Sequence, residues 1–68
     1  MNVRVNSTIM RIEMARYRLT NNSLKELTGV SKNTISAIRN GKSCSYDTAT
    51  KIAKALQIGV NELIENEG

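Results

Sequence analysis

Residues 29–41 have the sequence GVSKNTISAIRNG, in which two glycines enclose a short helical pattern. Gly29 can take the left-handed backbone that ends a helix, and Ser31 can cap the next helix by accepting a hydrogen bond from a free amide. Ile35 and Ile38 then fall on one face, and the polar residues around them point elsewhere. The pattern predicts a sharp turn, followed by a helix that two isoleucines anchor and whose polar side faces outward.

The composition favours a small, all-helical protein. The 68 residues suffice for one domain with one small core, because about 60% of the unfolded surface is buried at this length. Aromatic residues are 3% of the chain and proline is absent, so the core must be aliphatic. With no His and a lone Cys44, the sequence offers no catalytic residue, disulfide, metal site or cofactor site. We therefore do not expect an enzyme.

The charge is unevenly distributed. Ten Lys and Arg stand against six Asp and Glu, for a net charge of +4. All ten basic groups lie in residues 1–54, which carry roughly +7, whereas the end of the chain carries Glu62, Glu65 and Glu67. A basic body indicates a polyanionic partner, although ordinary solubility would also explain it. Without a signal peptide or an apolar run of about 20 residues, we expect a cytoplasmic protein with no membrane partner and no small-molecule ligand.

Capping residues and apolar periodicity predict five helices around one core. We expect them at about 7–18, 20–29, 31–40, 46–57 and 60–65, with a polar loop at 42–45. The first helix would be capped by Ser7 or Thr8, and its inward candidates are Ile9, Met10, Ile12, Met14 and Ala15. This arrangement makes residues 7–66 the domain and residues 67–68 a frayed end.

Residues 1–6 are expected to form a loose N-terminal arm, because so short a terminal segment cannot hold a strand unless something pairs with it. Two uses of such an arm remain open. Arg4 could reach a phosphate or a narrow minor groove, or Val3 and Val5 could add a strand to a partner subunit.

Two short helices joined by a glycine-containing turn form the arrangement that lays its second helix in the DNA major groove. Lys32 and Asn33 lie in the first turn of that second helix, and Ser36 lies one turn further along. Lysine can donate to O6 and N7 of guanine, and asparagine can make two hydrogen bonds to adenine. These residues are therefore candidate base contacts.

Phosphate contacts are expected on either side of the reading helix, from free helix amides and short polar side chains. The start of the second helix supplies Asn21 and Asn22, and the exit of the third supplies Asn40, Lys42 and Ser43.

Five pieces of the chain together carry a family resemblance that covers about residues 9–65. They are Thr20-Asn21-Asn22-Ser23-Leu24, Gly29-Val30-Ser31-Lys32-Asn33-Thr34-Ile35-Ser36, Arg39-Asn40-Gly41-Lys42, Ile52-Ala53-Lys54-Ala55-Leu56 and Glu62-Leu63. In this order and spacing they resemble the Cro/CI-type helix-turn-helix repressors, also called the XRE family. The resemblance implies a compact, five-helix, lambda-repressor-like domain that binds operator half-sites, usually as a dimer.

The resemblance also implies roles for individual residues. In that family, residues matching Lys32, Asn33, Thr34 and Ser36 face bases or nearby backbone. Residues matching Asn21, Ser31, Asn40 and Lys42 meet phosphates.

The chain departs from the family pattern in three places. Many members carry Glu before the Asn-Gly pair and Arg in the first helix, whereas this chain has Arg39 and Glu13, so we expect a reversed pair between them, with phosphate binding by Arg39 as the alternative. Lys25 stands where Ala is usual, which requires it to point outward or the motif helices to separate. Cys44 stands where proline is common.

Two functions follow from these patterns. The first is a sequence-specific regulator that binds double-stranded operator DNA, most plausibly a bacterial or phage repressor that binds as a homodimer. The second is a protein-interaction module, such as an antitoxin or antirepressor-like factor that uses the same fold.

Overall fold

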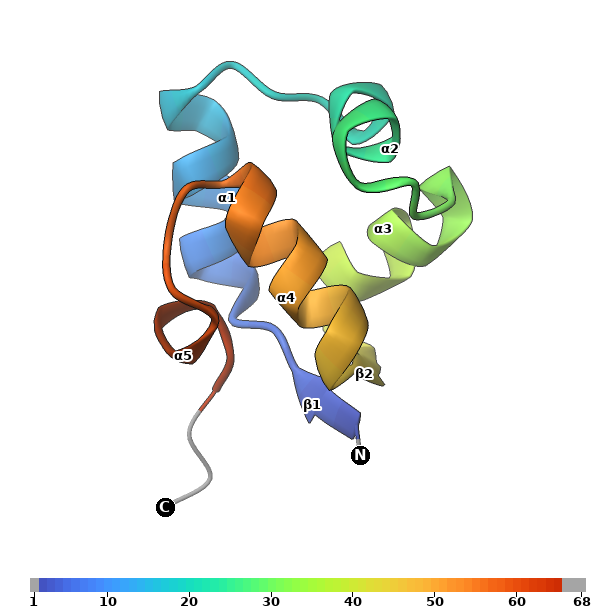
Figure 1. Cartoon of the computed structure of the whole chain (residues 1–68), viewed down its shortest axis with the longest axis vertical. Helices are drawn as coiled ribbons and strands as arrows, with labels where there is room; N and C mark the ends of the chain where they lie inside the picture. Colours follow the sequence, from blue (N-terminus) through green and yellow to red (C-terminus); the bar gives the residue numbers. More distant parts are fainter. Residues whose placement is uncertain (1, 66–68) are drawn as a thin grey trace.

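Five helices and two short strands make up residues 2–65, the part of the chain that the computed structural model describes (Figure 1). In chain order they are β1 (Asn2–Arg4), α1 (Ser7–Arg16), α2 (Asn21–Thr28), α3 (Lys32–Arg39), β2 (Ser43–Ser45), α4 (Tyr46–Ala55) and α5 (Val60–Leu63). The predicted all-α class with five helices is confirmed, because two three-residue strands leave the class unchanged. Met1 and the predicted frayed end at 67–68 lie outside the described residues.

Local capping defines α2 and α3, as the sequence predicted. Thr20 Oγ1 accepts a hydrogen bond from the Ser23 amide at 3.1 Å, and α2 ends at Gly29, whose φ of 76° is left-handed. Ser31 Oγ then accepts from the Thr34 amide at 3.2 Å to begin α3. The turn between the two motif helices therefore depends on the one residue type that adopts this backbone without strain.

The cap of α1 differs from the prediction. Asn6, rather than Ser7 or Thr8, caps α1, because its Oδ1 accepts from the Thr8 and Ile9 amides at 3.1 Å each. Asparagine is as good an N-cap as serine, and it stands one residue earlier.

The core is aliphatic and lies where α2, α3 and α4 meet, with α1 packed against α3 and α5 against α4. Its largest fully buried side chains are Met10, Leu24, Ile35, Ile38, Ile52, Leu56, Leu63 and Val5. The predicted inward face of α1 is partly wrong, because Ile12 is 53% exposed and Ala15 is also exposed. Lys25 is exposed and points outward, so it does not separate α2 from α3.

The N-terminal segment is not the loose arm that we expected. β1 pairs antiparallel with β2, which places Val3 opposite Cys44 inside the segment predicted as a polar loop. On its other side, the Glu65 amide donates to the Arg4 carbonyl and the Asn6 amide to the Leu63 carbonyl, both at 2.8 Å. Partners distant in sequence thus bond to the backbone of residues 2–4 on one side and of residues 4–6 on the other, and this pairing cannot be inferred from the six residues alone.

The same pairing explains why α5 ends at Leu63 rather than Glu65. Ile64 takes an extended backbone and forms an isolated bridge with Val5, which is 1% exposed. Val3 and Val5 therefore pack within their own chain. Figure 1 shows β1 beside β2, below the start of α4.

Candidate nucleic-acid interface

The outward side of α3 carries the predicted base contacts. Ile35 and Ile38 are 0% and 1% exposed, so one side of the helix is fixed in the core. The residues on its other sides are exposed, namely Lys32, Asn33, Thr34 and Ser36. The structure thus presents these four side chains together on one short helix whose buried side prevents it from rotating.

The N-terminus of α2 is the first flanking cluster. Among residues 2–65, neither the Asn21 nor the Asn22 backbone amide donates a hydrogen bond, whereas the Ser23 amide is used by the Thr20 cap. Free amides and the helix dipole make such an end favourable for an anion. Asn22 is exposed and Asn21 half-buried.

The exit of α3 is the second flanking cluster. Gly41, with a φ of 97°, turns the chain, and the Lys42 amide donates to the Ala37 carbonyl at 3.0 Å. Beyond the turn, Lys42 and Ser43 are exposed, and strand pairing places Arg4 opposite Ser43. Directly opposed residues of an antiparallel pair lie on the same face, so Arg4 adds a positive charge beside this cluster.

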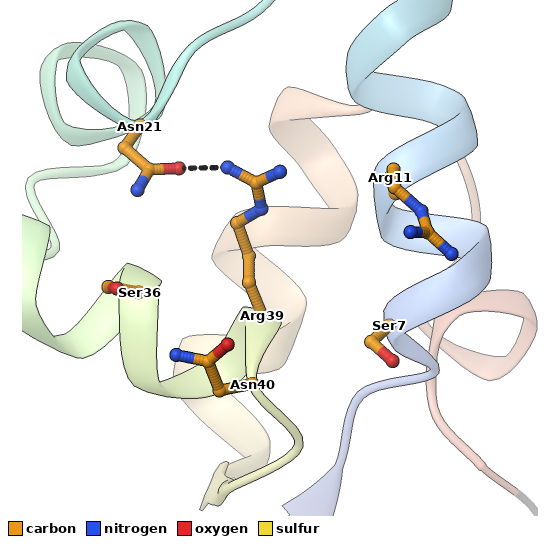
Figure 2. Close-up of a pocket in the computed structure, with 6 residues that line it drawn as sticks. All are labelled: Ser7, Arg11, Asn21, Ser36, Arg39 and Asn40. Carbon is orange, nitrogen blue, oxygen red and sulfur yellow. Dashed lines mark hydrogen bonds between the residues drawn. The ribbon is translucent and has the colours of Figure 1, made fainter.

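A polar cleft joins the two clusters on one face of the molecule (Figure 2). It has a volume of about 290 Å³ and is lined by Ser7, Arg11, Asn21, Ser36, Arg39 and Asn40. Three predicted DNA contacts, from α2, α3 and the turn after α3, therefore meet in one depression. Lys32, Asn33 and Lys42 do not line it.

Two residues of this cleft, Ser7 and Arg11, were missed by sequence reasoning. Both belong to α1. The sequence shows only that the arginines of this helix lie outside its apolar face. The spacing of Arg11 within α1 carries no signal that this face of α1 lies across from α3.

The expected pair between Glu13 and Arg39 is not formed. Arg39 Nη1 instead donates to Asn21 Oδ1 at 2.7 Å, because the arginine extends from the end of α3 toward the start of α2. Glu13 Oε1 lies 3.4 Å from Arg16 Nη1, one turn along the same helix. That oxygen makes no hydrogen bond among the described residues, so the buried carboxylate relies on this one ion pair.

The charges on the candidate interface are mostly unneutralised. Within residues 2–65 the ion pairs are Glu13 with Arg16 and Asp47 with Lys51, and neither pair lines the cleft. The face that carries the cleft is therefore positive where the predicted phosphate contacts lie.

Cys44 is a free, buried thiol. Burial raises the pKa of the Cys44 thiol, which keeps it neutral and poorly nucleophilic at neutral pH. No group of three or more His, Cys, Asp or Glu within residues 2–65 is arranged to hold a metal ion. No helix in that range is long and apolar enough to span a membrane.

Comparison with known proteins identifies the same kind of domain. A family model described as a Cro/C1-type HTH DNA-binding domain matches residues 10–67, which is most of the chain. No curated protein and no solved structure gives a significant match.

Proposed function

Because the chain belongs to the Cro/C1-type helix-turn-helix DNA-binding domain family, we propose that it is a sequence-specific repressor that reads operator half-sites through α3. The observation that carries this proposal is the division of α3 into a buried side and an exposed polar side. A helix held in this way offers several side chains to the major groove in one fixed orientation.

In the proposed complex, Lys32, Asn33, Thr34 and Ser36 contact base edges. Lys32 donates to guanine O6 and N7, and Asn33 bonds to adenine N6 and N7. Each good contact of this kind contributes about 1–3 kcal/mol of discrimination against the wrong base. The Ser31 hydroxyl donates to Thr34 Oγ1 at 2.9 Å, which limits the rotamers of Thr34 and favours a defined contact.

The proposed phosphate contacts are Asn21, Asn22, Ser31, Asn40, Lys42 and Ser43. The free amides at the start of α2 support Asn21 and Asn22, and the exposed polar turn after α3 supports Asn40, Lys42 and Ser43. Ser31 is proposed from the family resemblance alone, because its hydroxyl donates to Thr34 Oγ1. If two protomers together make roughly 6–10 phosphate contacts, affinity falls about 10³–10⁵-fold between 50 and 200 mM salt.

A homodimer on a palindromic operator would bring two copies of α3 to successive half-sites. Val5 and Leu63 are buried in the core of their own chain and are not accessible to a second subunit. The half-buried Ile64 beside α5 is therefore the better candidate for a subunit contact. The proposed DNA-binding unit extends the expected residues 7–66 to include β1 and Val5, which pack with the core. A cytoplasmic protein of bacterial or phage origin fits this role.

Selection from a random duplex library tests the proposal. We expect the wild type to enrich a palindrome and Lys32→Ala/Asn33→Ala to lose it, with a steep salt dependence for the wild type. The matched control is Lys54→Ala/Asn61→Ala, which removes the same two residue types from exposed positions on α4 and α5. If the control and the α3 variant bind the selected site equally well, α3 does not read bases.

The second candidate is a protein-interaction module, which the exposed apolar side chains favour. Leu27 is 62% exposed and Ile12 53% exposed. Base reading through α3 does not need exposed apolar side chains at these positions, whereas binding to another protein would use them. The repressor proposal would be replaced by this one if the protein enriched no duplex but bound tightly to a protein encoded next to it. Leu27→Ser should then abolish that complex.

A further inference from the structure

The polar cleft has the composition of an anion site. Its six lining residues include two arginines, from α1 and α3, and no acidic residue. Figure 2 shows Arg39 rising from the end of α3 toward Asn21, with Arg11 on α1 across the cleft. Neither guanidinium has a carboxylate partner among the described residues, so an anion between them would neutralise two charges.

Arg39 is held in place without being neutralised. Its Nη1 donates to Asn21 Oδ1 at 2.7 Å, and no other hydrogen bond of this guanidinium forms within the described residues. An amide oxygen orients the guanidinium but carries no charge to cancel it. The remaining donors keep the planar fork that binds two phosphate oxygens at once.

The start of α2 adds to the same field. Asn21 is the first residue of this eight-residue helix, and its backbone amide and that of Asn22 are unused in the described structure. The positive end of the helix dipole and the two arginines therefore act on one small volume. Three independent elements converge there, namely α1, α2 and α3.

The size of the cleft indicates which anion it takes. About 290 Å³ is at the lower limit for pockets that enclose a drug-sized ligand, and four of the six lining residues are exposed. An open depression of this size suits one phosphate group of a longer molecule better than a whole enclosed nucleotide. The predicted DNA contacts Ser36, Asn40 and Asn21 lie on its walls.

We infer that this cleft binds a single phosphate of the DNA backbone, with Arg39 and Arg11 as its charged donors and Asn21 as the residue that positions Arg39. The inference rests on the proposed function and extends it to α1. A phosphate gripped between α1 and α3 fixes how far α3 enters the groove and in which register, because phosphate contacts orient a protein on the duplex.

Neutral phosphate substitution tests the assignment. The selected operator is prepared with one methylphosphonate at each backbone position in turn, and binding is measured for wild type, Arg39→Met and Arg11→Met. At one position, neutralisation should lower wild-type affinity about tenfold, as expected for removal of a charge-assisted hydrogen bond. Each variant should lose a large part of the wild-type sensitivity at that same position, because only one of the two arginines remains there, and the slope of log affinity against log salt should decrease by about 0.9 for each phosphate that the protein no longer neutralises.

Lys54→Met is the matched control, because it removes one exposed positive charge from α4 and should keep the full wild-type profile. Arg39→Lys should recover part of the sensitivity at the cleft phosphate, since a lysine restores the charge without the fork. Thermal melts confirm that each variant is folded. A role of Arg39 limited to stabilising the end of α3 would change melting without changing the methylphosphonate profile.

Three results would overturn the inference. Parallel profiles for wild type and both arginine variants would show that the arginines contact no backbone phosphate. Insensitivity of the two variants at distant phosphates would show two separate contacts rather than one cleft. Parallel profiles with saturable binding of inorganic phosphate at Arg39 and Asn21, followed by NMR, would assign the cleft to a free phosphorylated ligand. In all three cases, sequence-specific binding by the wild type would leave the proposed function intact. If the wild type bound no specific sequence, both the proposed function and this inference would be refuted.

Discussion

α3 and β1 are both short elements on the edge of the same core, but different interactions define them. α3 begins at Ser31, which caps an amide three residues away, and ends next to a glycine turn. β1 has no such local signal, since its partners are Ser43–Ser45 on one side and Glu65 beyond its end on the other. A local signal lies within a few residues of sequence, whereas a pairing partner forty residues away must be found by folding.

The comparison also separates formation of an element from its placement. An isolated helix of eight residues is not stable in water, so the caps decide where α3 starts and stops but not whether it persists. Burial of Ile35 and Ile38 supplies that stability and determines which side of α3 faces outward. Nearby residues therefore determine where α3 begins and ends, and distant residues determine its orientation. For β1, distant residues determine both.

The largest expected effect comes from releasing α3 from the core. Ile35→Ala should lower the free energy of unfolding by about 2–5 kcal/mol, because it leaves a cavity at a fully buried position. Ile12→Ala is the matched control, since the same truncation at a side chain that is 53% exposed should change stability by less than about 0.5 kcal/mol. Urea denaturation measures both. Equal decreases for the two variants would mean that α3 is not anchored through Ile35.

A smaller effect is expected from β1. Val5→Ala removes two buried methyl groups and should cost about 1.5–2.5 kcal/mol by urea denaturation. In Val5→Ala, amide hydrogen exchange should show that the amides of Asn6 and Glu65, which donate to Leu63 and Arg4, lose protection before the amides of α3 do. If protection fell uniformly over the whole chain, β1 and α3 would belong to one cooperative unit and the contrast between them would disappear.

The parts of the fold that the sequence predicted are those with a local cause. Gly29, Thr20 and Ser31 determine the turn and both motif helices through contacts within three or four residues. The hydrophobic period failed in part of α1, where Ile12 is exposed. A short helix that contacts its neighbours on only part of its length does not bury every apolar residue in the stripe, and periodicity cannot tell which are left out.

The candidate interface divides in the same way. Lys32, Asn33 and Ser36 could be named from sequence, because their exposure follows from the burial of Ile35 on the same helix. The cleft could not be named, because it forms where separate helices converge. Arg39 was expected to pair with Glu13 or to bind phosphate, whereas its side chain bonds to Asn21, a neutral residue that no charge-based argument selects.

The smallest effect tests whether the inner face of the ribbon formed by β1 and β2 is closed to water. Burial raises the pKa of the Cys44 thiol above its usual 9.0, so the protonated form is favoured by folding. That contribution is complete below the unfolded-state pKa and is lost as pH rises through the higher folded-state value. In reducing buffer, the stability of the wild type should therefore fall more steeply above about pH 9 than that of Cys44→Ala, since the two chains differ only in that thiol. Val3 lies opposite Cys44 across the strands, so Val3→Ala should let water reach the thiol and make the two slopes more alike. Parallel stability curves for the wild type and Cys44→Ala would mean that β1 does not shield this face, and that β1 is held by its backbone hydrogen bonds alone.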